Sequence, residues 1–339
     1  MAGAAGSAET LADLGEWELL RRLAVFAPPG QFADDAALLQ ERADRQLVVN
    51  TDVLVEGVHF SDATMPAQAV GWRAAAANLS DLAAMGCTAV AGLTVGLVAP
   101  GCTPWAWVEG VYQGLEQALQ QHGGVLLGGD CSSGQQRLLA ITALGHVQPQ
   151  AGPIRRSDGR PGDWLLSTGP HGLSRLGLAL LLEQLAPEQR RQLSPNLQDR
   201  AIAAHQRPRP RLDAVAALHA SQPQAQPWRV GGTDSSDGLA AAVAGIAAAS
   251  GCGAALQRSA LPLDPELGEL EQGERWCLSG GEDFELILAL DPSWGQALLQ
   301  ALPGSRRIGT LVTGAAGGLH WQENGEPLAA GSAGFCHFQ

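Results

Sequence analysis

The sequence has little of what marks several common protein classes. Its six cysteines are scattered without a C-x-x-C pair, which argues against a disulfide scaffold or a zinc site and is typical of a reducing compartment. Lys and Arg total 21 against 34 Asp and Glu, and the net charge of −13 argues against nucleic acid or an anionic membrane as a partner. No apolar run approaches roughly 18 residues, the length of a membrane span. The first ten residues do not resemble a signal peptide, so we expect a cytoplasmic protein.

Three catalytic motifs are also absent. The sequence contains no G-x-x-x-x-G-K-[ST] loop, no G-x-G-x-x-G opening a βαβ unit and no G-x-S-x-G elbow, which argues against Walker and Rossmann nucleotide sites and against an α/β-hydrolase. What the chain has is 339 residues, 45% of them hydrophobic, with 43 glycines and 20 prolines spread as punctuation. This length and composition predict a well-buried core in two domains of ordinary size.

Strand-like and helix-like segments alternate along the chain. Three prolines and three arginines without apolar periodicity lie in residues 148–161, and this break predicts two domains, residues 1–150 and 151–339. The mixture predicts an α/β (α+β) fold, with a hairpin turn at Asn324-Gly325. The expected strands are 46–49, 89–99, 125–127, 138–146, 164–167 and 284–290, and the expected helices are 66–85, 104–122, 172–185 and 237–250.

Aspartates recur at the edges of these segments. Mg²⁺ prefers carboxylate oxygens and is usually shared with substrate phosphates, so several aspartates brought together from different elements would favour metal–phosphate chemistry. Taken singly, each of them is more simply a turn former or a helix cap. The aspartates in question are Asp34, Asp35, Asp52, Asp81, Asp130, Asp234 and Asp237.

Local geometry sharpens some of these expectations. In an extended chain Asn50 and Asp52 share one face and Thr51 points to the other. On a helix, Asn78 and Asp81 share a face. For the adjacent pair Asp34 and Asp35, the residues alone leave open which one faces a cluster.

Two glycine-containing segments could bind phosphate. Gly128-Gly129-Asp130 follows a strand, where glycine allows close approach to the backbone. Ser235-Ser236-Asp237-Gly238 opens a helix with free N–H groups, although a plain N-cap by Ser236 or Asp237 is the simpler interpretation.

Together these motifs resemble the thiamine-monophosphate kinase family, within the superfamily of aminoimidazole ribonucleotide synthetase. The resemblance runs nearly from end to end, and the order and spacing of the motifs make it specific. The matching segments are ADDAALL at 33–39, NTDVLVEGVHF at 50–60, NLSDLAAMG at 78–86, GGD at 128–130, RSDGRPGDW at 156–164, RPRPR at 207–211, DSSDGL at 234–239, GGEDFEL at 280–286 and FCHF at 335–338.

The resemblance implies the two-domain fold of that superfamily and ATP-dependent phosphorylation of thiamine phosphate to thiamine diphosphate. It also implies several Mg²⁺ ions, ATP as co-substrate and a homodimer formed through the N-terminal halves. Its implied metal ligands are Asp35, Asn50, Thr51, Asp52, Asp81, Asp130, Asp234 and Asp237, of which Asp130 and Asp237 are also the implied catalytic residues. Implied ATP contacts are Gly129, Asp130, Arg156, Ser236 and Tyr112, and implied thiamine phosphate contacts are His59, Glu282 and Phe335.

The chain departs from the family pattern at three positions. Ala33 stands where a glycine is usual, Asn50 replaces a Ser or Thr, and Cys131 replaces a hydroxyl residue. None of these changes removes a carboxylate, so we expect the activity to be kept. Two alternatives stay open: an ATP-using synthetase of the same fold that forms an iminophosphate or acyl phosphate, and a nucleotide-binding protein without turnover.

Overall fold

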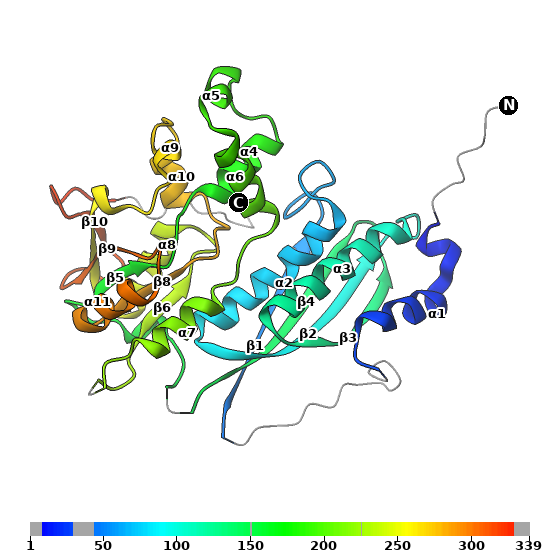
Figure 1. Ribbon diagram of the computed structural model, residues 1–339, viewed down its shortest axis with the longest axis horizontal. Helices are drawn as coiled ribbons and strands as arrows, with labels where there is room; N and C mark the ends of the chain where they lie inside the picture. Colours follow the sequence, from blue (N-terminus) through cyan, green and yellow to red (C-terminus); the bar gives the residue numbers. More distant parts are fainter. Residues whose placement is uncertain (1–8, 30–43, 150, 225, 329–339) are drawn as a thin grey trace. The chain divides into compact units, whose positions relative to one another are not determined.

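The chain divides into two compact units (Figure 1). The computed structural model describes residues 9–29, 44–149, 151–224 and 226–328. Of these, residues 9–29, 49–78 and 89–145 form unit 1, and the remaining described residues form unit 2. In the described ranges no helix is long and apolar enough to cross a membrane. The predicted site residues Asp35 and Phe335 lie outside the described residues.

Unit 1 is built around most of a four-stranded sheet in the order β1-β4-β2-β3. Strands β2 and β3 pair in parallel, with Gly96 opposite Asp130, and β1 and β3 form the two edges. The strands are β1 (Gln46–Val55), β2 (Cys87–Ala99), β3 (Val125–Ser133) and β4 (Leu138–Val147), and the helices are α1 (Leu11–Leu23), η1 (Ala24–Phe26), α2 (Ala67–Ala84) and α3 (Trp105–His122). The ends of four of these elements, residues 46–48, 79–84, 87–88 and 146–147, belong to unit 2.

Helices α2 and α3 pack closely because glycines lie between them. A Cβ atom on Gly71 would come within 1.8 Å of the Val111 carbonyl oxygen, and one on Gly114 within 2.0 Å of the Gln68 carbonyl oxygen. Only glycine permits such an approach of two backbones. Along β4, every second residue is buried, as expected for a sheet with one face covered.

Unit 2 contains a six-stranded mixed sheet in the order β10-β7-β9-β5-β8-β6. Its strands are β5 (Trp164–Ser167), β6 (Gly231–Asp234), β7 (Gly253–Leu256), β8 (Leu286–Leu290), β9 (Arg306–Val312) and β10 (Leu319–Trp321). Its helices are η2 (Arg156–Asp158), α4 (Leu173–Leu181), α5 (Pro187–Gln192), α6 (Pro195–Gln206), α7 (Leu212–Ala220), α8 (Leu239–Ala249), η3 (Arg258–Ala260), α9 (Pro265–Gly268), α10 (Gly273–Ser279) and α11 (Pro292–Ala301).

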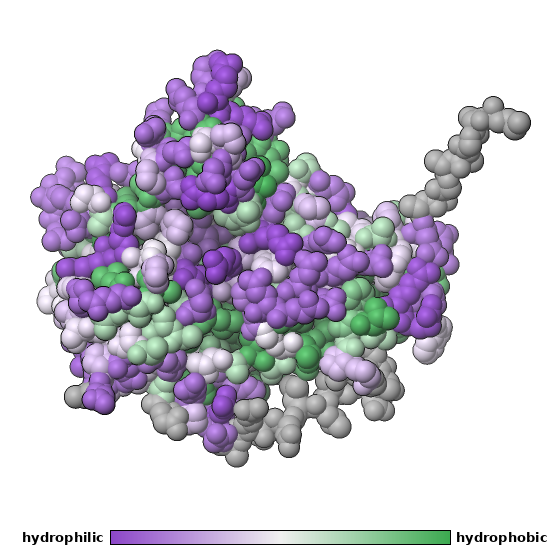
Figure 2. All heavy atoms as spheres, viewed as in Figure 1, coloured by the Kyte–Doolittle hydropathy of each residue, from purple (hydrophilic) through white to green (hydrophobic). Residues whose placement is uncertain are grey.

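Three hydrophobic clusters hold unit 2 together. Helix α8 packs against the sheet through residues such as Val243 and Ile246, and α7 and α11 meet the sheet around Trp294. A third cluster, centred on Leu176, joins α4, α6 and α10. The polar helix α5 buries no residue and forms the hydrophilic projection at the top of Figure 2. Apolar burial of this kind is the main favourable contribution to folding.

The predicted elements agree with the structure where neighbouring residues alone determine the backbone. Strand β5 covers residues 164–167 as predicted, and the Asn324-Gly325 turn is confirmed by the antiparallel bridge between His320 and Pro327. The strand predicted at 284–290 starts late, at Leu286, because Phe284 has a φ of 52°, which is incompatible with a strand. The division at residue 150 stays a prediction.

Candidate functional site

Three predicted metal ligands follow one another on β1. The strand continues past them, so Asn50 and Asp52 point to one face and Thr51 to the other. Thr51 Oγ1 lies 2.8 Å from Thr142 Oγ1 on β4. On the opposite face, Asn50 Nδ2 donates to Asn78 Oδ1 of α2 over 3.0 Å. The strand thus brings Asn50 and Asp52 together and directs Thr51 away from them.

Three of the predicted carboxylates lack a partner among the described residues. Asp52 is half-buried, and burial raises its pKa; Asp130 and Asp237 are exposed. Within the described ranges no group donates a hydrogen bond to these carboxylates, and no cation pairs with them. Carboxylate oxygens in this condition suit a hard divalent cation such as Mg²⁺. In chemical type these oxygens fit the predicted metal.

Asp52 and Asp130 lie on opposite edge strands of the sheet. Three strand spacings separate these edges, or about 14 Å, so one ion cannot bind both carboxylates directly. In the part of the chain that the structure describes, no group of three or more His, Cys, Asp or Glu side chains could hold a metal ion. A single metal cluster is therefore not assembled from the described residues of unit 1.

Gly129 is needed for packing within the sheet. A Cβ on Gly129 would come within 2.0 Å of the Val95 carbonyl oxygen on β2, whereas a Cβ on Gly128 would meet nothing within 4 Å. The close approach of β2 and β3 therefore requires glycine at position 129.

In unit 2, Asp234 ends strand β6 and is held by a serine. Ser80 Oγ donates to Asp234 Oδ2 over 2.8 Å, and both residues are buried. Arg156 lies beside them, because its Nε donates to Thr233 Oγ1 over 3.1 Å. The structure thus brings Arg156 next to the Asp234 strand. Ser80 was not predicted, although it is one of the polar residues in the segment NLSD.

Ser236 and Asp237 project from the turn between β6 and α8, and both are exposed. Helix α8 begins at Leu239, and its N-cap is Gly238, with a φ of 106°. The capping role considered for Ser236 or Asp237 is therefore wrong. Because glycine has no side chain to cap the helix, the first N–H groups of α8 can receive an anion.

The side chain of Ser235, just before Ser236, is held by His171, a residue that was not predicted from the sequence. His171 is buried, and burial lowers its pKa to about 4, so the imidazole is neutral at pH 7. Its Nδ1 lies 3.2 Å from the Gly169 carbonyl oxygen and its Nε2 lies 2.9 Å from Ser235 Oγ. Since the carbonyl can only accept, Nδ1 carries the proton and Ser235 donates to Nε2.

The GGED segment lies against the same turn. The Glu282 N–H donates to the Ser236 carbonyl oxygen over 2.7 Å. The Asp283 carboxylate accepts from the N–H groups of Gly172 and Ser174, at 2.7 and 3.1 Å, and burial raises its pKa to about 7. Asp283 therefore organises the start of α4, while its neighbour Glu282 is the predicted substrate contact.

Two further predicted contacts lie in unit 1. His59 Nδ1 accepts from the Val55 N–H over 3.0 Å, which places the ring proton on Nε2 as a donor. Tyr112 is 3% exposed and packs against Phe26, with ring centroids 5.6 Å apart; burial raises its pKa. These contacts favour the core interpretation of Tyr112. Asp81, on the end of α2 that belongs to unit 2, is half-buried.

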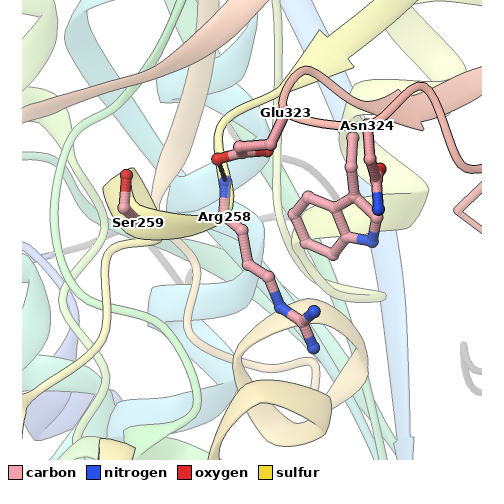
Figure 3. A pocket seen from close by; sticks show the side chains of 5 residues that line it. Arg258, Ser259, Glu323 and Asn324 are labelled. Carbon is pink, nitrogen blue, oxygen red and sulfur yellow. Dashed lines mark hydrogen bonds between the residues drawn. The ribbon is translucent and has the colours of Figure 1, made fainter.

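A pocket of about 430 Å³ in unit 2 contains none of the predicted residues (Figure 3). Its arginine, Arg258, is bound through Nε and one terminal nitrogen by the Glu274 carboxylate, at 2.7 and 2.8 Å. The guanidinium is thereby neutralised. The residues that line the pocket are Arg258, Ser259, Trp321, Glu323 and Asn324.

Comparison with known proteins covers nearly the whole chain. Residues 33–147 match the N-terminal domain of AIR synthase related protein, and residues 160–322 match its C-terminal domain. The thiamine-monophosphate kinase of Prochlorococcus marinus is 47% identical over 94% of both chains, and that of Synechococcus elongatus is 50% identical over 91% of both. The chain belongs to the thiamine-monophosphate kinase family. The prediction of an enzyme of this family is thereby confirmed.

Solved structures of the family confirm the fold. The thiamine-monophosphate kinase of Stenotrophomonas maltophilia K279a has a TM-score of 0.76 and 31% identity, covering 93% of this chain and 98% of its own. AaThiL, complexed with AMPPCP and TMP, has a TM-score of 0.73 and 27% identity, covering 96% and 98%. The hydrogenase maturation protein HypE of E. coli, at 20% identity and a TM-score of 0.72 over 92% and 96% of the two chains, shares the fold alone.

Proposed function

We propose that the chain transfers the γ-phosphoryl group of ATP to thiamine phosphate, giving thiamine diphosphate and ADP in the cytoplasm. The observation that carries this proposal is the identity of 47–50% to thiamine-monophosphate kinases over more than nine-tenths of the chain. The AMPPCP and TMP bound to the structural relative support the same pair of substrates. The departures at Ala33, Asn50 and Cys131 leave every predicted carboxylate in place.

Several Mg²⁺ ions are proposed to neutralise the phosphates, held by the predicted oxygen ligands. The carboxylates of Asp52, Asp130 and Asp237, which have no partner among the described residues, support this, because carboxylate oxygens are ligands that Mg²⁺ prefers and Mg²⁺ neutralises phosphate charge in phosphoryl transfer. Asp130 and Asp237 are the proposed catalytic residues. The full proposed ligand set is Asp35, Asn50, Thr51, Asp52, Asp81, Asp130, Asp234 and Asp237.

The chain's own residues would bind and orient the two substrates. The acceptor phosphate is already an anion, so it needs positioning rather than a strong general base, and direct in-line transfer follows. His59 Nε2–H would donate to the acceptor phosphate, while Arg156 and the first N–H groups of α8 beside Ser236 would bind ATP oxygens. Glu282 and Phe335 are the proposed contacts of the thiamine rings.

An end-point assay tests the proposal. Purified protein is incubated with Mg²⁺, ATP and thiamine phosphate, and thiamine diphosphate is separated by chromatography, with unphosphorylated thiamine and a substrate of the aminoimidazole pathway as controls. We expect one thiamine diphosphate per ADP, formed from thiamine phosphate alone. ADP released only with another acceptor would instead support a synthetase. Binding of Mg-ATP without turnover on any acceptor would indicate a site that has lost its chemistry.

A homodimer is part of the proposal. Strand β1 is an edge strand, and its outer face carries Leu47, Val49 and Val53, which are 53, 55 and 43% exposed. An exposed apolar row on a sheet edge favours association with another chain, and a second copy is the proposed occupant. Sedimentation of the wild type as a dimer and of Val49→Lys with Val53→Lys as a monomer would support it; a monomeric wild type would overturn it.

A further inference from the structure

Asn78 is a wholly buried amide in the middle of helix α2. Its exposed fraction is 0%, and its neighbours in sequence include Ala76 and Leu79, which are also fully buried. Asparagine is a poor helix former, and a buried amide is costly unless its polar atoms are bonded. The residue at this position is therefore held by its hydrogen bonds rather than by helix propensity.

Asn78 makes three hydrogen bonds with described residues, and all three lie within unit 1. Its Nδ2 donates to the Ala74 carbonyl oxygen over 2.9 Å. Its Oδ1 accepts from the Asp52 N–H over 3.1 Å and from Asn50 Nδ2 over 3.0 Å. Two of these partners are predicted metal ligands, and both belong to an edge strand, whose N–H groups on the outer side have no neighbouring strand to bond.

Two backbone groups fix which end of each amide points where. The Ala74 carbonyl can only accept and the Asp52 N–H can only donate, so Asn78 must direct Nδ2 to Ala74 and Oδ1 to β1. Asn50 can then reach Asn78 only with its own Nδ2. The orientation of the Asn50 amide thus follows from the backbone, through Asn78.

This orientation matters because an amide has one end that binds a cation and one that repels it. A Ser or Thr hydroxyl, which the family usually has at position 50, presents an oxygen in every rotamer. Asn50 presents an oxygen only when its nitrogen is engaged elsewhere. The bond to Asn78 engages that nitrogen and leaves Oδ1 as the end that can face a metal ion.

We propose that Asn78 is a positioning residue that makes Asn50 usable as a metal ligand and holds the backbone at Asp52. The inference rests on the proposed metal role of β1. Residues that orient metal ligands in this way typically change metal affinity by about 10- to 100-fold when they are removed.

A double-mutant cycle tests the proposal without relying on turnover. Binding of Mn²⁺ alone to the full chain, without nucleotide, is measured by the loss of the free-ion electron paramagnetic resonance signal. In the wild-type background, Asn78→Ala should weaken Mn²⁺ binding about tenfold. In an Asn50→Thr background the same change should weaken it less than about threefold, because the hydroxyl needs no orientation.

Two controls separate positioning from folding. Gln68→Ala removes an amide on the same helix that is bonded to Gln113 over 2.7 Å, and it should leave Mn²⁺ binding unchanged. The urea midpoint of Asn78→Ala should fall in both backgrounds, because the bonds to the Ala74 carbonyl and from the Asp52 N–H are lost in both. Asn78→Ser, which is smaller but polar, replaces Asn78→Ala if the latter does not fold.

The outcomes are distinguishable. An equal loss of Mn²⁺ binding in both backgrounds, or no loss in either, would overturn the role of Asn78 in orienting Asn50. Failure of the wild type itself to bind Mn²⁺ would instead overturn the proposed metal role on which the inference rests.

Discussion

Two acidic segments of unit 2 lie against each other and use their carboxylates in opposite ways. In the segment 234–237, Ser236 and Asp237 are exposed, and the Asp237 carboxylate has no partner in the described ranges. In the segment 282–285, Asp283 accepts from two backbone N–H groups, and Glu285 is bonded to Thr168 and Arg211. One segment keeps an acid available, and the other uses its acids to hold the structure.

The segment that holds the structure also has the more constrained backbone. Glu282 and Phe284 have φ values of 61° and 52°, in the left-handed region that side chains rarely adopt. Such conformations persist only where the surroundings fix them, and the hydrogen bonds of Asp283 and Glu285 do so here. The comparison teaches that a carboxylate's role is read from its partners: Asp283 and Glu285, which hold structure, accept from several donors, whereas the candidate ligand Asp237 has none among the described residues.

Replacing Glu285 should give the largest effect on stability. Glu285→Gln removes one of the two carboxylates bonded to the buried Arg211 guanidinium and leaves the other, Asp213. The loss should therefore be at most about 3–5 kcal/mol, the typical cost of breaking a buried ion pair. Urea unfolding measures the loss. Arg191→Gln, which breaks a pair whose side chains are both at least 70% exposed, is the matched control and should cost less than about 0.5 kcal/mol. Equal losses of unfolding free energy for the two variants would contradict a structural role for Glu285.

Asp283→Asn should change how stability depends on pH. The folded pKa of about 7 lies above the ordinary value of 3.8, so the folded state retains a proton that the unfolded state releases between these values. Wild-type stability therefore falls as pH rises from about 4 to 7 through this group. The variant lacks this fall, although it loses one backbone hydrogen bond, at a cost of about 1–3 kcal/mol.

Urea unfolding of both proteins at pH 4.5 and 7.5 checks this prediction. The variant should be less stable than the wild type at pH 4.5, and the gap should narrow or reverse at pH 7.5. A constant gap would mean that Asp283 does not titrate in this window.

Glycine should be preferred to alanine at position 282. Both Glu282→Gly and Glu282→Ala remove the side chain, but at a φ of 61° alanine retains a left-handed strain of about 1–2 kcal/mol that glycine lacks. We expect the glycine variant to be more stable by about 1 kcal/mol in urea unfolding. The same pair at Asp199, an exposed position inside α6, should show the reverse order.

Asp237→Asn should have the smallest effect on stability, within about 0.5 kcal/mol of the wild type, because the exposed carboxylate has no described partner to lose. The proposed function expects the same change to abolish formation of thiamine diphosphate. Thermal unfolding and the end-point assay on one preparation measure both quantities. A strongly destabilised variant would place Asp237 among the acids that hold the structure.

The sequence predicted what depends on neighbouring residues. The alternation on β1 separates Thr51 from Asn50 and Asp52 as expected. The first and last residues of β5 also agree with the prediction. The end-to-end motifs identified the family because their order is a property of the chain itself. Local signals of this kind need no knowledge of the fold.

Residues that act across the fold were missed. Ser80 meets Asp234 over 154 residues of chain and His171 meets Ser235 over 64, so no local pattern pairs them. Phe284 was expected in a strand because it is apolar and adjoins one, but the hydrogen bonds of its neighbours Asp283 and Glu285 impose its left-handed conformation. Tertiary contacts decide such positions.

The hydrogen bond from the Glu282 N–H to the Ser236 carbonyl oxygen makes one amide a reporter on two segments. That proton exchanges with solvent only when the contact opens, so its exchange rate measures how often the exposed acidic turn separates from the segment that supports it. A nucleotide that binds the turn should slow the exchange of this single amide, and the slowing can be followed site by site in deuterium oxide without any chemistry taking place.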